Sequence, residues 1–278
     1  MTILSYVFSN YLLSCNLSSY ACFFRRGMPT VFIQYAVFCL GLSGLPTAYS
    51  AEILVVGTEF AQIFERDVSG EFTGFGVEII RAMAKKTGDT VNFQIFPWAR
   101  AQWMVENNQA QILVGPYKTV EREAKFFFAS RAFYRDDMVF YVKKSTNVFW
   151  DGSYLSLRDS KIAVINGWVY GKQFESKRPE LKLEMVYSLN SGIKMLLASR
   201  FDFLASNVRN TDAIAKNLGL TNDIVALSPI IDHENGYFAY CKQAVCDSLR
   251  WRFDEIFESM KTNGELAKIA QYYAVRLP

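Results

Sequence analysis

Histidine is nearly missing from this sequence, and its scarcity excludes several kinds of chemistry. The one histidine among 278 residues is His233, in the segment Asp232-His233-Glu234. A Ser-His-Asp hydrolase needs a histidine beside its nucleophile, and a zinc site needs several nitrogen or sulfur ligands at a regular spacing. The sequence offers neither pattern. We therefore predict no catalytic residue, no metal and no cofactor, and we interpret His233 as a solvated loop residue.

A large net charge is also missing. The chain carries 30 Lys+Arg against 27 Asp+Glu, for a formal net charge of +3. No basic surface for a nucleic acid is predicted from this balance. Apolar residues make up 51% of the chain, which is enough to build the core of one large domain or two ordinary ones.

Acidic residues are absent from residues 1–50, where Arg25 and Arg26 are the only charged residues. The basic pair precedes an apolar run over residues 31–45, which is shorter than the roughly 20 residues of a membrane span. The segment Ala48–Ser50 then places small residues where a signal peptidase reads the chain. This pattern predicts a secretory leader and export to the periplasm.

We predict that the leader covers residues 1–50 and is cleaved after Ser50, with Ala51 as the alternative. Met1 and Met28 are both possible starts, because the residues before the basic pair are unusually apolar. An uncleaved membrane anchor is the competing interpretation of the same apolar run.

Cysteine is rare after the leader. Cys15, Cys22 and Cys39 fall within the first 50 residues, and only Cys241 and Cys246 follow. In an oxidising compartment such a close pair predicts a disulfide, and two buried thiols are the alternative. No cysteine follows the apolar run as a lipid attachment site, so we expect a freely soluble mature protein.

The rest of the chain alternates short apolar strands with amphipathic helices. We expect strands at residues 52–56, 91–95, 112–114, 138–142, 161–165, 181–186, 201–205 and 236–240. We expect helices at residues 74–88, 97–108, 191–199, 211–218, 249–260 and 266–273, and another beginning at Gly167. Two halves rich in βαβ units predict an α/β fold with two lobes and a cleft between them.

One stretch, Gln111 to Arg122, has the features of a ligand-binding loop. Ile112–Val114 reads as a buried strand, which the pair Gly115-Pro116 is expected to end. Ligands sit at the carboxyl ends of strands in open α/β sheets, and a guanidinium matches a carboxylate. We interpret Arg122 as the grip for an anionic group, with a solvated surface arginine as the alternative.

Four short motifs occur in an order that resembles a known family. They are ILVVGTE at residues 53–59, GEFTGFGVEI at 70–79, TVER at 119–122 and SRFDF at 199–203. Together with the ending KTNGELAKIAQYY, they resemble the bacterial extracellular solute-binding proteins of family 3, which bind polar amino acids for ABC transporters. The resemblance covers roughly residues 52–276.

The resemblance implies a periplasmic binding protein fold of type II. Each lobe would be a mixed, mostly parallel sheet flanked by helices, with the ligand cleft between the lobes. Lobe one would comprise residues 52–138 plus 238–278, and lobe two residues 139–237. The implied function is the capture of a small carboxylate-bearing or amino-acid-like solute for an ABC permease, by closure of the lobes in a monomer.

Two other functions remain open on this fold. A ligand sensor could deliver its solute to a membrane receptor instead of a permease. A periplasmic dehydratase acting on cyclic carboxylic acids could use Glu59 as a catalytic acid in an apolar cleft.

The family's site residues can be carried over position by position. Arg122 matches the arginine that pairs with the ligand's carboxylate, and Thr119, Gly115 and Tyr117 match positions that support the same contact. Glu59 is the acid after the first strand. Phe60, Trp98 and Trp168 are candidate aromatic walls of the cleft. Arg100 is a possible second anion contact, with a salt bridge at a helix start as the alternative.

The departures from the family point away from an ordinary amino acid. Asn207 stands where amino-acid binders place an aspartate for the ligand's ammonium, and an amide cannot neutralise a cation. Tyr117 replaces a small hydroxyl residue, so its ring would fill part of the cleft. Val169 and Gln111 also replace frequent polar residues. We therefore expect a carboxylate-bearing or otherwise polar solute stacked on aromatic walls.

Overall fold

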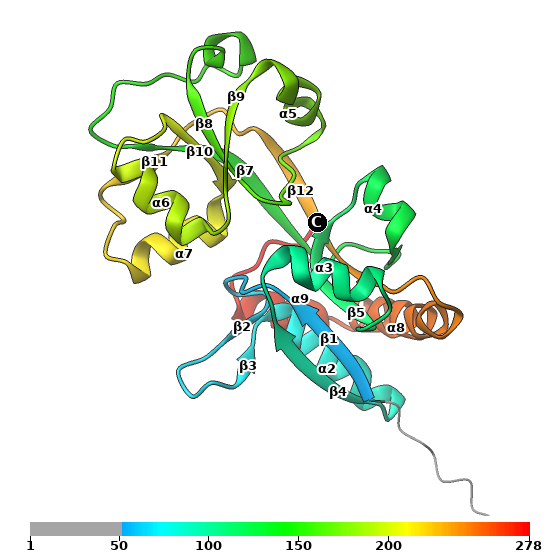
Figure 1. Ribbon diagram of the computed structural model, residues 1–278. Coiled ribbons are helices and arrows are strands. Elements are labelled where there is room, and N and C mark those ends of the chain that lie inside the picture. Colours follow the sequence, from blue (N-terminus) through cyan, green and yellow to red (C-terminus); the bar gives the residue numbers. More distant parts are fainter. Residues whose placement is uncertain (1–51) are drawn as a thin grey trace, which may run out of the picture. The chain divides into compact units, whose positions relative to one another are not determined.

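The computed structural model describes residues 52–278, so the predicted leader and its cleavage site lie outside the described residues. Within this range the fold is α/β, as predicted, and ten strands form one sheet, eight of them in a continuous path (Figure 1). The path runs through β4 (Thr90–Ile95), β1 (Glu52–Gly57), β5 (Ile112–Tyr117), β12 (Asp232–Tyr240), β7 (Tyr134–Lys143), β10 (Phe203–Asn207), β8 (Lys161–Ile165) and β9 (Lys182–Val186). Two short strands, β6 (Phe127–Phe128) and β11 (Ile224–Ala226), pair with β12 and β7.

Two groups of parallel strands lie at the ends of this path. β1 pairs in parallel with β4 and β5, and β8 pairs in parallel with β9 and β10. The long strands β7 and β12 run antiparallel to each other, and each also pairs with one of the groups. We call the group around β1 lobe one and the group around β8 lobe two; the lobe boundaries at residues 138 and 238 stay a prediction.

Helices cover the strands of lobe one. α2 (Phe75–Thr87), α8 (Ala244–Thr262) and α9 (Glu265–Tyr272) contact one another, and α3 (Trp98–Glu106) contacts β1 and β5. α2 buries one apolar face and ends at Gly88 in the left-handed conformation, as its sequence predicts. Lysines in the last turn of α2 complement the helix dipole. A hairpin of β2 (Glu65–Arg66) and β3 (Phe72–Thr73) precedes α2 and was not predicted.

Lobe two carries shorter helices. They are α5 (Lys172–Lys177), α6 (Leu189–Leu197) and α7 (Val208–Asn217), with single 3-10 turns at η1 (Tyr154–Leu157) and η2 (Arg178–Glu180). Side chains of Ser188 and Asn207 cap α6 and α7 by accepting a bond from the first turn. α4 (Val120–Lys125) follows β5. Among the helices of residues 52–278, none combines the length and hydropathy that a membrane span requires.

Several predicted boundaries are wrong by three residues or more, and glycines explain two of them. β5 does not end at Gly115-Pro116 but continues to Tyr117, because Gly115 adopts φ 86° and the pairing with β12 shifts register there. The helix expected to begin at Gly167 begins at Lys172, because Gly167 and Gly171 both have positive φ and keep the segment between them out of the helix. The strands β7 and β12 and the helices α7 and α8 begin earlier than predicted, at residues 134, 232, 208 and 244.

The two cysteines of the described chain lie close together where β12 leads into α8. The sulfur atoms of Cys241 and Cys246 are 1.97 Å apart and their Cα atoms 5.6 Å apart, the spacing of a disulfide. Both side chains are buried in the core of lobe one.

Gly236 is a point where two elements approach closely. A methyl group at this position would lie 1.9 Å from a ring carbon of Tyr134, whose side chain is fully buried. The Tyr134 hydroxyl donates a 2.8 Å hydrogen bond to the carbonyl oxygen of Gly115. The missing side chain of Gly236 therefore lets an aromatic ring pack between β12 and β5.

We expect Gly236→Ala to lower the free energy of unfolding by about 1–3 kcal/mol or more, because the buried ring has no space into which it can move. Urea unfolding followed by circular dichroism measures the change. Asn235→Ala, at the exposed neighbour on the same strand, is the control and should shift stability by less than about 0.5 kcal/mol. Equal midpoints for Gly236→Ala and the wild type would contradict the packing argument.

Candidate functional site

Arg122 owes its position to the strand and the helix cap that precede it. β5 ends at Tyr117, and the side chain of Thr119 then caps α4 by accepting a 3.2 Å bond from the N–H of Arg122. This cap fixes the first helical turn and directs the arginine inward. Only 7% of Arg122 is exposed, so the alternative of a solvated surface arginine does not hold.

The guanidinium of Arg122 has neutral partners. One terminal nitrogen donates to the carbonyl oxygen of Tyr117 at 2.8 Å, and the other donates to that of Gly167 at 2.7 Å. The group also stacks over Trp98, 5.7 Å from the ring centre. No carboxylate of residues 52–278 forms an ion pair with it. Burial lowers the pKa of Arg122, although a guanidinium stays protonated, so the site holds a cation without a protein counter-ion.

A narrow cavity, which we call the chamber, surrounds this cation. It is lined by Phe60, Trp98, Val114, Gly115, Tyr117, Arg122 and Trp168. Trp98 closes one side by donating its indole N–H to the carbonyl oxygen of Gly167 at 3.1 Å. Phe60 and Trp168 close another side through an edge-to-face contact of 5.8 Å. The chamber therefore combines one buried positive charge with mostly aromatic walls.

A larger open cavity borders the chamber and shares Trp98 and Trp168 with it. Glu59 lines this outer cavity and is itself exposed. Asn166 and Asn190 also line it. Its lining therefore includes polar side chains and an acid, which the lining of the chamber lacks apart from Arg122 and the Tyr117 hydroxyl.

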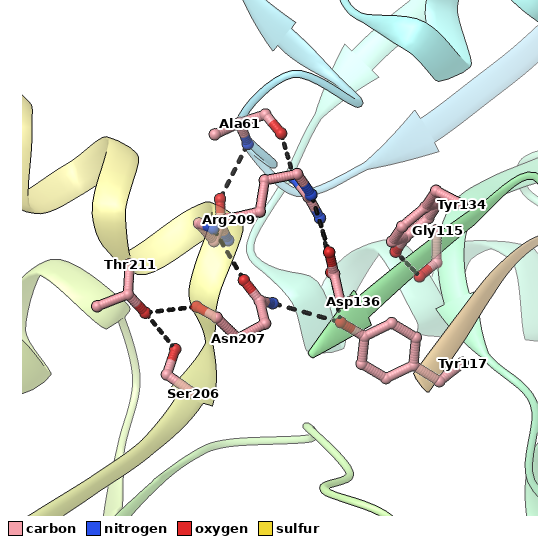
Figure 2. Close-up of polar contacts among 10 residues, drawn as sticks. Ala61, Gly115, Tyr117, Tyr134, Asp136, Ser206, Asn207, Arg209 and Thr211 are labelled. Atoms are coloured by element: carbon pink, nitrogen blue, oxygen red, sulfur yellow. Dashed lines mark hydrogen bonds and ion pairs between the residues drawn. The ribbon is translucent and has the colours of Figure 1, made fainter. Parts of the chain in front are cut away.

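Behind the chamber, Tyr117 joins a buried polar network (Figure 2). The Tyr117 hydroxyl donates to Asp136 at 2.8 Å and accepts a 3.3 Å bond from the amide nitrogen of Asn207. Arg209 binds both carboxylate oxygens of Asp136, at 2.9 and 2.7 Å. Burial, followed by the nearby Asp136, raises the pKa of Tyr117 well above its ordinary value, so the hydroxyl stays neutral and donates.

Arg209 also connects the two lobes. It donates to the carbonyl oxygen of Ala61 and stacks on Phe60, 4.8 Å from the ring centre. The N–H of Ala61 in turn donates to the side chain of Asn210 at 2.9 Å. Burial opposes the charge of Arg209, but the carboxylate of Asp136 outweighs it and raises the pKa of Arg209. The start of α7 is thus bonded directly to the loop after β1, through Arg209 and Asn210.

The structure brings six of the predicted site residues to the chamber and leaves four elsewhere. Arg122, Tyr117, Gly115, Phe60, Trp98 and Trp168 line the chamber. Glu59 lies in the outer cavity, and Thr119 and Asn207 are helix caps. Arg100 lies on an exposed helix face, where its guanidinium lies over Phe96. The binding role of all ten residues stays a prediction.

Sequence reasoning missed Asp136 and Arg209, which are 73 positions apart in the chain. No motif links them, because an ion pair between lobes leaves no local pattern. Asp136 belongs to β7, where the charged segment Arg135-Asp136-Asp137 precedes the apolar run from Met138, and the one signal is that a strand places an aspartate toward its buried side. Such a residue needs a partner when it is buried.

His233 was predicted to lie in a solvated loop, but it lies in β12, where its side chain is partly exposed and bonds to Asp137 at 2.6 Å. The next residue, Glu234, is half-buried on the same strand. Burial, with the nearby Asp232, raises the pKa of Glu234 to about 7; Arg122 opposes this shift and Glu175 adds to it. Glu234, a carboxyl group that titrates near neutral pH, therefore interacts electrostatically with the cation of the chamber, Arg122.

We expect Asp136→Asn to cost about 3–5 kcal/mol of stability, because it leaves the buried charge of Arg209 without a counter-ion. The two side chains are only 1% and 11% exposed. Urea unfolding measures the loss. Glu258→Gln, which removes an ion pair with Arg131 whose side chains are 43% and 59% exposed, is the matched control and should cost less than about 1 kcal/mol. Similar losses in both variants would show that burial does not matter here.

We expect Glu234→Gln to stabilise the protein at pH 8 but not at pH 5. The folded-state pKa near 7 exceeds the ordinary value of 4.5, so the loss of stability is absent below pH 4.5, grows as the pH rises from 4.5 to 7 and is complete above 7. The gain at pH 8 should be on the order of 1 kcal/mol, or roughly 2–4 °C in Tm. Thermal unfolding at both pH values measures it, with the exposed Glu255→Gln as control. An equal gain at pH 5 would contradict the assignment.

Solved structures share this fold. A histidine kinase sensor domain with similarity to periplasmic binding proteins superposes with a TM-score of 0.73 at 18% identity, covering 82% of this chain and 98% of that one. The substrate-binding protein of an amino acid ABC transporter gives a TM-score of 0.68 at 22% identity, covering 80% and 99%. These likenesses confirm the predicted two-lobe fold of type II.

Sequence comparison identifies the family. The probable amino-acid-binding protein YxeM of Bacillus subtilis (strain 168) is 23% identical over 208 residues, which are 74% of this chain and 77% of that protein. The family model of the bacterial extracellular solute-binding proteins, family 3, matches residues 54–276. The match spans nearly all of the described residues, including β1, the chamber and the final helices. The chain therefore belongs to the bacterial extracellular solute-binding proteins of family 3.

Proposed function

We propose that the protein captures a small carboxylate-bearing or amino-acid-like solute in the periplasm and presents it to an ABC permease. The observation that carries the proposal is the buried guanidinium of Arg122, which lies in a chamber between lobes and has no protein counter-ion among the described residues. A ligand carboxylate would supply the missing charge and could accept two parallel bonds from the guanidinium. Family membership supports both a location outside the cytoplasm and a role in binding.

Closure of the lobes is the mechanism that we propose for capture. Arg122 belongs to the segment after β5 of lobe one, whereas Gly167 belongs to lobe two. A ligand held by the arginine would lie against the Trp98 wall from lobe one and the Trp168 wall from lobe two. Binding energy from both walls would then favour the closed arrangement.

The dehydratase alternative gains no support from the geometry. It depended on Glu59 acting as an acid within an apolar cleft, but Glu59 is exposed and lines the open outer cavity. An exposed carboxyl group lacks the apolar surroundings that this role requires. We therefore propose capture and release without turnover.

We expect Arg122→Ala to abolish solute binding and leave the fold intact, because it removes one partner of a desolvated ion pair, worth about 2–5 kcal/mol. A thermal-shift screen with amino acids and organic acids finds the ligand, and calorimetry then compares the two proteins. Arg131→Ala, at an exposed arginine on the surface of lobe one, is the control. Unchanged affinity in Arg122→Ala, with an unaltered circular dichroism spectrum, would place the site elsewhere.

A further inference from the structure

We propose that the chamber takes a small monocarboxylic acid with an apolar body and no ammonium group, such as an aromatic or branched short-chain acid. This inference rests on the proposed capture function and narrows its ligand class. Two features of the chamber carry it. Its wall holds a single charge, which is positive, and the hydrogen-bond acceptors around it already have protein donors.

The main-chain acceptors that border the chamber are occupied. The carbonyl oxygen of Gly167 accepts two bonds, one from the chamber's guanidinium at 2.7 Å and one from the indole of Trp98 at 3.1 Å. The carbonyl oxygen of Tyr117 accepts from the same guanidinium, and that of Gly115 accepts from the hydroxyl of Tyr134. These neutral carbonyls supply no charge opposite to that of an ammonium group, and a buried cation without a counter-ion is costly.

The side-chain acceptors next to the chamber are committed as well (Figure 2). Both oxygens of Asp136 bind Arg209, and one of them also accepts from the hydroxyl of Tyr117. The side-chain oxygen of Asn207 accepts from the backbone of Asn210. Arg209 therefore neutralises Asp136, and the chamber is lined by Tyr117 and not by Asp136. Nothing in the described wall offers a negative charge to a zwitterion.

The polarity of the walls defines the rest of the ligand. Four of the seven lining residues are aromatic, and Val114 and Gly115 are apolar. A ring or branched chain with one carboxylate would contact these walls and exclude water from the ion pair.

The carboxylate would take the place that a carbonyl now fills on Arg122. A guanidinium bond to a charged acceptor is stronger than one to a neutral carbonyl, so the exchange is favourable. The charges of Glu121 and of the half-buried Glu234 both act on this cation, and Asp232 and Glu175 act on Glu234 in turn. Since an ionised Glu234 competes for the same positive charge, anion binding should not strengthen as the pH rises above 7.

Matched pairs of acids that differ only in the ammonium group test the proposal by calorimetry at pH 7. The pairs are 3-phenylpropionate with L-phenylalanine and 3-methylbutanoate with L-valine; benzoate and benzamide test the need for charge. We expect each acid to bind at least roughly 100-fold more tightly than its amino acid, and benzamide not to bind. Arg122→Gln should lose the acids while its circular dichroism spectrum stays unchanged.

Other outcomes separate this proposal from the proposed function. Amino acids that bind as tightly as their matched acids, in a manner that depends on Arg122, would overturn the ligand class and leave solute capture standing. No binding of any acid or amino acid in the screen, or binding that Arg122→Gln leaves unchanged, would overturn both.

A variant tests whether the network behind the chamber causes the selectivity. Tyr117→Ser combined with Asn207→Asp opens the path to a carboxylate and adds a second one, and an aspartate can still cap α7. We expect the ratio of acid to amino-acid affinity to fall at least about tenfold in this double variant. A ratio equal to that of the wild type would show that other groups set the selectivity, against the argument made from Tyr117 and Asn207.

Discussion

A buried positive charge needs a partner, and in this protein the charge of Arg122 has none of opposite sign within residues 52–278. Carbonyl dipoles compensate for part of its lost hydration, but they leave the net charge in place. The desolvation cost of this charge arises just after β5, where aromatic side chains line the chamber around the guanidinium. A fold that keeps an unpaired cation in such a place stabilises any anion that can enter.

The second buried arginine shows how the same fold treats a charge that serves structure. Arg209 has a carboxylate on two of its nitrogens and a carbonyl on a third, and its pKa is raised, whereas that of Arg122 is lowered. Both arginines connect the lobes, and both lie within reach of Tyr117. Asp136 neutralises Arg209, which therefore serves as a permanent structural contact. No acid of the described residues forms an ion pair with Arg122, whose charge therefore remains available to a ligand.

Local patterns made much of this architecture predictable. The strand at residues 161–165 and the cap at Gly88 follow from periodicity and glycine placement, and the two-lobe fold follows from motif order. Prediction failed where distant segments meet. The continuation of β5 through Pro116 depends on a register shift in β12, more than 110 residues later. Gly167 reaches Arg122 because it lies in a turn. The sequence pattern around Gly167 predicted the start of a helix there instead.

The contact between Gly167 and Arg122 also sets a condition on how a ligand would favour the proposed closure. The carbonyl of Gly167 in lobe two accepts a hydrogen bond from the guanidinium of lobe one. A ligand that replaces this bond would shift the equilibrium only by the difference between its own contacts and those it removes. Under the proposed function, the carboxylate would contribute through its charge, and the apolar body would contribute by touching Trp98 and Trp168 together. An anion too small to reach both rings would bind the arginine and displace Gly167, yet it would weaken the closed arrangement. Charge would therefore determine which solutes bind, and the reach of the apolar body would determine which of them close the lobes.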